Sequence, residues 1–360
     1  MTRLRRLVAL LGAALLLVAA CGDDDAAGPT TTDGGTTDTT ASGGDDGDDT
    51  PTGTLVIYSG RGEDLVGPIV DRFSEVTGIQ TEVRYGNSAE MLLLIQEEGA
   101  NSPADVYYSQ GAGFLGTLSD SGDLAELPDD ILDRVVDPEL RSPNGDWVGL
   151  TGRARTVAYN TNVLSEDEVP DSLADFVDPE WRGRIGWAPT NASFQDHVTA
   201  LRFLLGEDGA RDWLEGIMAN DPVTYENNGA ILQAIAAGEI DVGFVNHYYL
   251  YRNLAEDPAF PVANKYYTDG DPGALVNIAG AGILATSDQE ELAQEFLRFL
   301  LSAEAQEMFA ESNFELPVVA DVDPPEGLPR IDSLQLPVFD LNLLLDLQGT
   351  VDLLIAVGAL

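Results

Sequence analysis

Two adjacent phenols, Tyr248 and Tyr249, are the side chains of this sequence best suited to hold a hard, highly charged cation. They follow residues 240–246, whose apolar pattern predicts a buried strand. A phenol has an ordinary pKa of about 10, but a bound metal ion displaces its proton, as it does from coordinated water. Two phenolates would cancel two of the three charges of ferric iron, and one anion would balance the third. The alternative is that the pair only packs, as the pairs at 107–108 and 266–267 can.

Two further turns carry groups that bind anions. In residues 59–62 (Ser-Gly-Arg-Gly), Arg61 can pair with an anion through two parallel hydrogen bonds, and the glycines allow close backbone approach. The second turn, residues 189–193, places small hydroxyl and amide side chains at the start of a predicted helix. These side chains either cap the helix or bind an anion at its N-terminus, and the sequence leaves both interpretations open.

The elements around these turns alternate between strand and helix patterns. Glycines at 78 and 238 predict helix ends, and Asn87 with Glu90 and Ser287 with Glu290 predict capping boxes at helix starts. This alternation indicates an α/β fold with parallel strands and crossover helices, whose ligands bind at the carboxyl ends of strands. Strands are expected at residues 54–58, 81–85, 104–108, 155–160, 184–187, 240–246, 276–278 and 282–285. Helices are expected at 64–77, 114–118, 194–205, 229–237 and 341–354.

The N-terminus has the organisation of a bacterial secretion signal. A basic start precedes an apolar run at 7–20, and small residues lead to Cys21, the only cysteine. This pattern resembles the lipobox, which implies that residues 1–20 are a signal peptide and that Cys21 carries a lipid anchor outside the cytoplasm. The alternative is an ordinary signal peptide with an incidental cysteine. Residues 21–53 are almost wholly Asp, Thr, Gly, Ser and Ala, and predict a disordered tether because they cannot bury enough apolar area.

The composition narrows the classes of function. The remaining length of about 300 residues is more than one core usually serves, which predicts two lobes. The formal net charge of −44 argues against nucleic acid and anionic membrane surfaces as partners. The acidity either concentrates cations near the surface or reflects a salty habitat or a genome-wide composition, and the sequence leaves both interpretations open. The chain has no P-loop, no HExxH motif and no cysteine nucleophile, so no enzymatic activity is expected.

Five segments occur in order: residues 55–61 (Leu-Val-Ile-Tyr-Ser-Gly-Arg), 102–106 (Ser-Pro-Ala-Asp-Val), 152–155 (Gly-Arg-Ala-Arg), 238–241 (Gly-Glu-Ile-Asp) with 246–249 (Asn-His-Tyr-Tyr), and 271–275 (Asp-Pro-Gly-Ala-Leu). Together they resemble the bacterial ferric-iron-binding periplasmic proteins over residues 54–320. The family implies a two-lobed, type II periplasmic-binding-protein fold, with each lobe a mixed, mostly parallel sheet flanked by helices and with hinge crossovers between lobes. The expected lobes are residues 54–153 with 277–329, and residues 154–276 with 330–360.

The resemblance also implies a ligand set. Tyr248 and Tyr249 would bind the metal, while a histidine and a glutamate used by several members match Gly62 and Gln110 here. Anion or water oxygens, held partly by Arg61, are therefore expected to fill those positions. Gln110 and His247 are further candidates, although strand alternation would turn His247 away from Tyr248. The predicted anion-binding residues are Arg61, Gly62, Thr190, Asn191, Ala192, Ser193, Asn228 and Asn246.

These implications define the expected function. A monomeric lipoprotein would capture ferric iron with carbonate or phosphate as the synergistic anion, close its lobes, and deliver the iron to the permease of an ABC importer. One alternative is a binding protein of the same fold for an organic anion such as a phosphonate or a sugar phosphate. The other is a secreted hydrolase with an acidic site that the sequence does not reveal.

Overall fold

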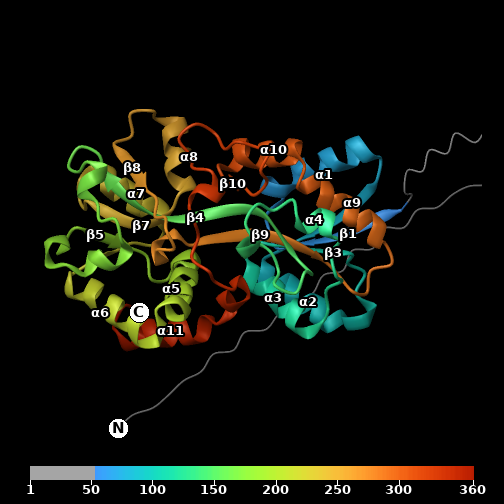
Figure 1. The fold of residues 1–360 in the computed structure, drawn as a ribbon, viewed down its shortest axis with the longest axis horizontal. Helices are drawn as coiled ribbons and strands as arrows, with labels where there is room; N and C mark the ends of the chain where they lie inside the picture. The colour runs from blue at the N-terminus through green and yellow to red at the C-terminus, as the bar shows by residue number, and fades with distance from the viewer. Residues whose placement is uncertain (1–52) are drawn as a thin grey trace, which may run out of the picture. The chain divides into compact units, whose positions relative to one another are not determined.

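The computed structural model describes residues 53–360, and within them a mixed sheet flanked by helices extends through two lobes (Figure 1). The strands are β1 (Thr54–Ser59), β2 (Gln80–Tyr85), β3 (Val106–Ser109), β4 (Val148–Asn160), β5 (Ile185–Trp187), β6 (Val223–Thr224), β7 (Val242–Asn246), β8 (Val262–Lys265), β9 (Val276–Ile283) and β10 (Leu316–Pro317). Their order is β2-β1-β3-β9-β4-β7-β5-β6, with β8 and β10 paired to β4. This arrangement confirms the predicted α/β fold class.

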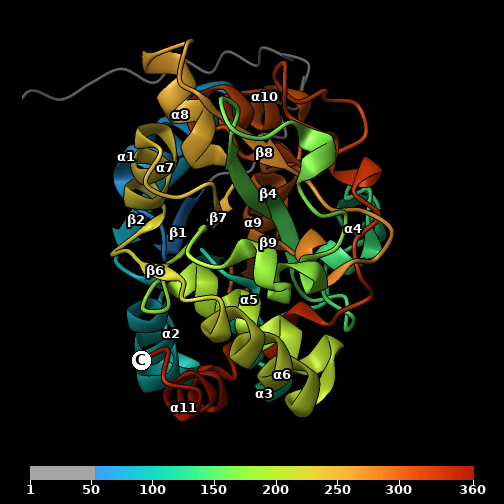
Figure 2. The ribbon, with the colours of Figure 1, turned by 90° about the vertical axis from the view of Figure 1, so that its left-hand side faces the viewer.

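Helices cover both lobes. They are α1 (Glu63–Thr77), α2 (Ser88–Glu98), α3 (Ala112–Ser121), α4 (Asp129–Leu132), α5 (Ala192–Leu204), α6 (Gly206–Ala219), α7 (Asn228–Ala237), α8 (Tyr248–Glu256), α9 (Glu290–Leu300), α10 (Ala303–Asn313) and α11 (Leu347–Ala356). In the second lobe, α5, α6 and α11 lie on one side of the strands and α7 and α8 on the other (Figures 1 and 2). The buried side chains divide in the same way, into one cluster on each side.

Two strands connect the lobes and place the binding cleft. β4 pairs with β9 through its first half and with β7 through its second half, so one strand belongs to the sheets of both lobes. Both pairings are antiparallel, whereas β1 with β2 and β3, and β5 with β6 and β7, are parallel. The side chains near the middle of β4 therefore face the junction between the lobes.

Local sequence signals account for several element ends. Gly78 and Gly238 end α1 and α7 in the left-handed conformation, with φ of 76° and 74°. Glycine adopts this conformation at little cost because it has no Cβ atom, so both predicted helix ends are confirmed. The predicted capping box of Asn87 and Glu90 is also present at the start of α2.

Three predicted elements differ from the structure. The two strands expected at 276–278 and 282–285 are the single strand β9. The capping box expected at Ser287 is absent, because the Ser287 hydroxyl donates to Asp105 at 2.6 Å and accepts from the Gln289 N–H. The helix expected at 341–354 is a 3-10 helix, Leu341–Leu345, followed by α11.

The C-terminal segment, residues 330–360, packs against both lobes. Buried side chains from Ile331 to Leu344 group with the first-lobe core, and Leu353 and Leu354 group with the core of the second lobe. The expected assignment of the whole segment to the second lobe differs from this packing, and the expected limits of the lobes otherwise remain a prediction.

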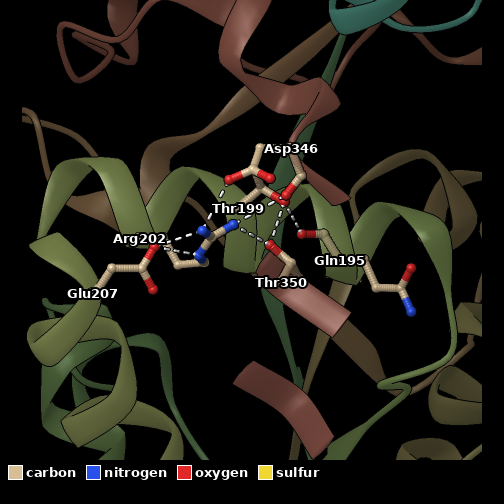
Figure 3. A network of polar contacts seen from close by, with 6 residues as sticks. All are labelled: Gln195, Thr199, Arg202, Glu207, Asp346 and Thr350. Carbon is tan, nitrogen blue, oxygen red and sulfur yellow. Dashed lines mark hydrogen bonds and ion pairs between the residues drawn. The ribbon is translucent and has the colours of Figure 1, made fainter. Parts of the chain in front are cut away.

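A buried arginine of α5 holds the start of α11. Arg202 donates to the backbone carbonyl of Asp346 at 3.0 Å, to its carboxylate at 2.9 Å, and to the Thr350 hydroxyl at 3.2 Å (Figure 3). Thr350 also bonds the hydroxyl of Thr199, 2.7 Å away on α5. These bonds fix α11 to the second lobe directly after the segment leaves the first.

The predicted signal peptide (1–20), lipid site (Cys21) and tether (21–53) lie outside the described residues, apart from residue 53. From residue 53 onward, none of the helices combines the length and the apolar character needed to cross a bilayer.

Candidate metal and anion site

A cavity of about 370 Å³ lies between the lobes and receives side chains from both of them and from the crossover strands. This volume falls within the range of ordinary ligand pockets. The first lobe contributes Asn87, Ser88, Gln110 and Phe114, and the second contributes Asn191, Ala192, Ser193, Asp196, Asn246, Tyr248 and Tyr249. The crossover strands and adjoining residues add Arg153, Arg155, Leu275 and Asn277.

The two predicted metal ligands are the first residues of α8 and lie in this cavity. Tyr248 and Tyr249 are half-buried, and their rings stack with centroids 4.5 Å apart at an angle of 27°. The guanidinium of Arg252 lies 4.9 Å from the Tyr248 centroid, on the ring face. Burial, followed by the neighbouring Tyr248, raises the pKa of Tyr249, so a metal ion must displace its proton.

The other tyrosine pairs do not line the cavity. Tyr107 and Tyr108 are fully buried in the first-lobe core, and Tyr107 donates to the Ser88 carbonyl at 2.7 Å. Tyr267 is also buried, and the Tyr266 hydroxyl lies 3.3 Å from that of Tyr251. The packing role that the sequence left open for adjacent tyrosines therefore applies to these two pairs.

A polar cradle faces the cavity at the N-terminus of α5. The Asn191 side chain caps this helix by accepting from the Ser193 N–H at 3.1 Å, and it also accepts from the Ser193 hydroxyl at 2.6 Å. Asn228 lies behind the cradle, where it donates to Asn191 at 3.2 Å and accepts from the Asn246 N–H at 2.9 Å. Capping and placement beside the cavity therefore coexist at this turn.

Arg155 is the cation of this cradle. Its side chain is buried, and one nitrogen, Nη1, donates to Asn246 at 2.9 Å and to the Ser193 hydroxyl at 3.2 Å. Its Nε and Nη2 atoms have no partner among the described residues. Burial lowers the pKa of Arg155 to about 10, which still leaves the guanidinium charged at neutral pH. Two free donors on a buried cation favour binding of an anion.

Comparison with known proteins places the chain in a family. The family model for bacterial extracellular solute-binding proteins matches residues 101–335. The major ferric iron-binding protein of Neisseria meningitidis is 33% identical, over 79% of this chain and 86% of its own. The chain belongs to the bacterial ferric-iron-binding protein family.

Solved structures agree with this assignment. Iron-bound HitA from Pseudomonas aeruginosa is 35% identical, with a TM-score of 0.73 over 85% of this chain and 99% of its own. The Trichodesmium IdiA (FutA) protein, solved with iron and citrate ligands, is 31% identical, with a TM-score of 0.76 over the same shares. The two-lobed, type II periplasmic-binding-protein fold expected from the sequence is thereby confirmed, and the family is one of solute-binding proteins.

The Ser-Gly-Arg-Gly turn, residues 59–62, does not present Arg61 to the cavity. This placement corrects the anion-binding role predicted for Arg61. Two Arg61 nitrogens donate to the two carboxylate oxygens of Glu315 at 2.9 and 2.8 Å, and both side chains are buried. Thr151 donates to the same carboxylate at 2.6 Å. Burial raises the pKa of Glu315, but the charge and hydrogen bonds of Arg61 outweigh it and lower this pKa to about 2. Arg61 is therefore neutralised inside the protein.

His247 is not placed as a metal ligand, because both ring nitrogens already have partners. Nδ1 accepts from the Ala154 N–H at 3.1 Å and Nε2 donates to the Phe314 carbonyl at 2.8 Å. Burial lowers the pKa of His247 to about 4, so the ring is neutral. The residue precedes α8 directly, so helix geometry, rather than the expected strand alternation, separates it from Tyr248.

The remaining predicted residues divide between the cavity and its surroundings. Gln110 lines the cavity from the first lobe, and Ala192 lines it at the first turn of α5. Gly62 and Thr190 are exposed and do not line it. Gly62 instead precedes α1 as its N-cap residue.

Three functional candidates were missed from the sequence. Arg153 and Arg155 are two positions apart on β4, and this spacing places both side chains on one face of a strand. Arg153 donates to the Ile278 carbonyl at 3.0 Å and to that of Gln110, while its Nε has no described partner. Asp196 accepts from Asn277 at 2.8 Å. Burial raises the pKa of Asp196 to about 6, against the opposing charges of Arg153 and Arg155.

Proposed function

We propose that this chain binds ferric iron together with a synergistic anion and delivers it to the permease of an ABC importer. The observation that carries the proposal is the pairing of two stacked phenols, Tyr248 and Tyr249, with the buried and partly unpaired guanidinium of Arg155 in one interlobe cavity. Phenolates suit a hard trivalent cation, and the guanidinium suits the anion that completes its charge balance. Relatives named for ferric iron binding support the same metal.

The ligand set is asymmetric between the lobes. The second lobe supplies both phenolates and the N-terminus of α5, whereas the first-lobe cavity residues include no carboxylate or imidazole. Carbonate or phosphate, held by Arg155, Ser193 and Asn246, would therefore occupy coordination positions that protein side chains fill elsewhere. The cavity of about 370 Å³ also accommodates a larger carboxylate, as in the Trichodesmium relative with citrate.

Capture and release would follow from relative movement of the lobes. The proposed lobes are residues 54–153 with 277–329 and residues 154–276 with 330–360, subject to the shared packing of the C-terminal segment. Closure brings Gln110 and the first-lobe turns over a ligand already held by the second lobe. A monomeric lipoprotein, anchored through Cys21 and separated from the membrane by the acidic tether, would present this closed form to the importer. Neither nucleic acid nor a catalytic reaction has a place in this scheme.

The polar cradle favours one second candidate. Arg155 and the start of α5 can hold the anionic group of a phosphonate or a sugar phosphate, with the tyrosines packing on its organic part. In that case the phenols would stay protonated. The hydrolase alternative has no comparable support among the described residues.

A ferric titration with bicarbonate or phosphate separates the candidates. We expect a visible phenolate-to-iron charge-transfer band that is lost in the double variant Tyr248→Phe, Tyr249→Phe. Tyr85→Phe is the matched control, because Tyr85 is also half-buried but does not line the cavity. A colourless wild-type protein that binds 2-aminoethylphosphonate or a sugar phosphate in calorimetry would reject the iron assignment in favour of the organic anion.

A further inference from the structure

We infer that His247 is a positioning residue that fixes the two tyrosines relative to the first lobe, through the corner between α10 and β10. The inference rests on the proposed role of the tyrosines as metal ligands. This corner, residues 313–315, is defined by Asn313, Phe314 and Glu315 and belongs to the first lobe, where Phe314 packs against the core. His247 lies in the second lobe, between β7 and α8.

The hydrogen-bond partners of the His247 ring allow only one tautomer. Its side chain is fully buried, and a backbone N–H can only donate while a carbonyl can only accept. Nδ1 must therefore be the acceptor from Ala154, at 3.1 Å, and Nε2 the donor to Phe314, at 2.8 Å. The backbone of His247 is held as well, since its N–H donates to the Ala154 carbonyl at 3.0 Å and its carbonyl accepts from Asn264 at 3.0 Å.

The corner that receives this hydrogen bond is held from three directions. Phe314 adopts the left-handed conformation, with φ of 57°, which is uncommon for a bulky residue and persists only where surrounding contacts enforce it. Its ring stacks on Tyr251 of α8, with centroids 6.2 Å apart at 26°. The next residue, Glu315, is fixed by the buried pairing with Arg61 and by Thr151.

This arrangement gives Arg61 an indirect role at the site. The first-lobe turn holds Glu315, Glu315 fixes the Phe314 carbonyl, and that carbonyl orients the ring of His247. Tyr248 is the next residue along the chain, so no flexible segment separates the hydrogen bond from the metal ligands. A ligand set needs its groups held within about 0.5 Å of the productive geometry, and a link to the first lobe would supply that precision.

Two single variants of the full-length chain separate the two hydrogen bonds of His247. His247→Gln keeps an N–H donor at the position of Nε2 and so retains the bond to Phe314. His247→Asn keeps an acceptor at the position of Nδ1, so it retains the bond to Ala154 and loses the bond to Phe314. We expect His247→Asn to release iron about tenfold faster to a competing chelator and to shift its charge-transfer maximum, while His247→Gln stays within about twofold of wild type.

A metal-free measurement tests the link between His247 and the first lobe separately from iron binding. Amide hydrogens of residues 248–251 should exchange faster in His247→Asn than in His247→Gln, because only the asparagine variant loses the link to the first lobe. Equal exchange and equal release in the two variants would overturn the inference and leave the proposed function intact. A wild-type protein without a charge-transfer band would reject both the proposed function and the positioning of metal ligands, even if the exchange rates differed.

Discussion

His197 makes the stability of the metal-free protein depend on pH, with a sign and size that follow from its burial. The ring lies inside α5, where Nε2 contacts the Pro272 carbonyl at 3.0 Å and Nδ1 has no partner among the described residues. Burial, followed by the charge of Arg155, lowers the pKa of His197 from 6.5 to about 3. The folded protein therefore keeps this ring neutral, whereas the unfolded chain takes up a proton below pH 6.5. Because the unfolded state binds more protons in this window, stability is lost as the pH falls.

The size of the effect follows from the same two pKa values. Between pH 7 and pH 5, protonation of the unfolded ring should remove about 2 kcal/mol of unfolding free energy. His197→Gln is the matched variant, because its side-chain amide can still meet the Pro272 carbonyl but does not titrate. We expect urea unfolding of the variant to show a loss about 2 kcal/mol smaller over this interval. His247, whose pKa is lowered to about 4, contributes equally to both proteins and cancels in the comparison.

The comparison of wild type with His197→Gln also separates two effects of low pH, iron release and unfolding. Protons compete with iron for phenolate oxygens, and they also destabilise a fold with neutral buried imidazoles. Removing the contribution of His197 should change the acid unfolding curve of the metal-free protein without changing the pH at which bound iron is released at temperatures far below unfolding. If wild type and variant lost the same unfolding free energy between pH 7 and pH 5, the reasoning about a buried neutral ring would be refuted.

Two further predictions test the two best-defined arginines. Arg155→Met should lower the affinity for phosphate in the ferric titration by about ten- to a hundredfold, because a charge-assisted hydrogen bond contributes about 1.5–3 kcal/mol. An unchanged phosphate affinity would remove Arg155 from the anion site. Arg61→Met should cost about 3–5 kcal/mol in urea unfolding by leaving Glu315 buried without its partner, while the double variant Arg61→Met, Glu315→Met should recover most of that loss. A double variant as unstable as the single one would show that the ion pair itself, rather than the isolated carboxylate, accounts for the cost.

The predictions that succeeded rest on residues whose effect is local. Gly78 and Gly238 adopt a backbone conformation that favours glycine, and Asn87 and Glu90 satisfy backbone groups within one helical turn. The placement of Tyr248 and Tyr249 beside the cavity was recognisable because both residues are adjacent in sequence and closely follow a buried strand, and their role as metal ligands stays a prediction. Such signals need no knowledge of how distant segments meet.

The predictions that failed depend on distant partners. Glu315 lies 254 residues from Arg61, and nothing in the Ser-Gly-Arg-Gly turn indicates that a carboxylate will bury itself there. The Ser287 hydroxyl was likewise diverted from its helix by Asp105, 182 residues away. The arginines of β4 could have been recognised from the sequence. Two cations on one face of a predicted strand must contact either solvent or a ligand, because burying them without a partner is costly.

Arg61 and Arg155 show why residue type alone cannot identify a binding arginine. Both are buried, and both lie on or beside strands that lead toward the cleft. Both terminal nitrogens of Arg61 donate to the carboxylate of Glu315. Arg155 donates only through Nη1, and its partners there are neutral side chains. A buried cation without an internal counter-charge is costly, so the fold retains it only where a ligand can complete it or where the remaining donors serve another contact. Asp196 is the carboxylate whose charge acts on Arg155, but it accepts a hydrogen bond from Asn277 and none from the guanidinium, and burial raises its own pKa to about 6. The lack of a hydrogen-bonded carboxylate on Arg155 among the described residues, in a chain with a net charge of −44, is therefore a stronger argument for an external anion at that position than the presence of the arginine itself.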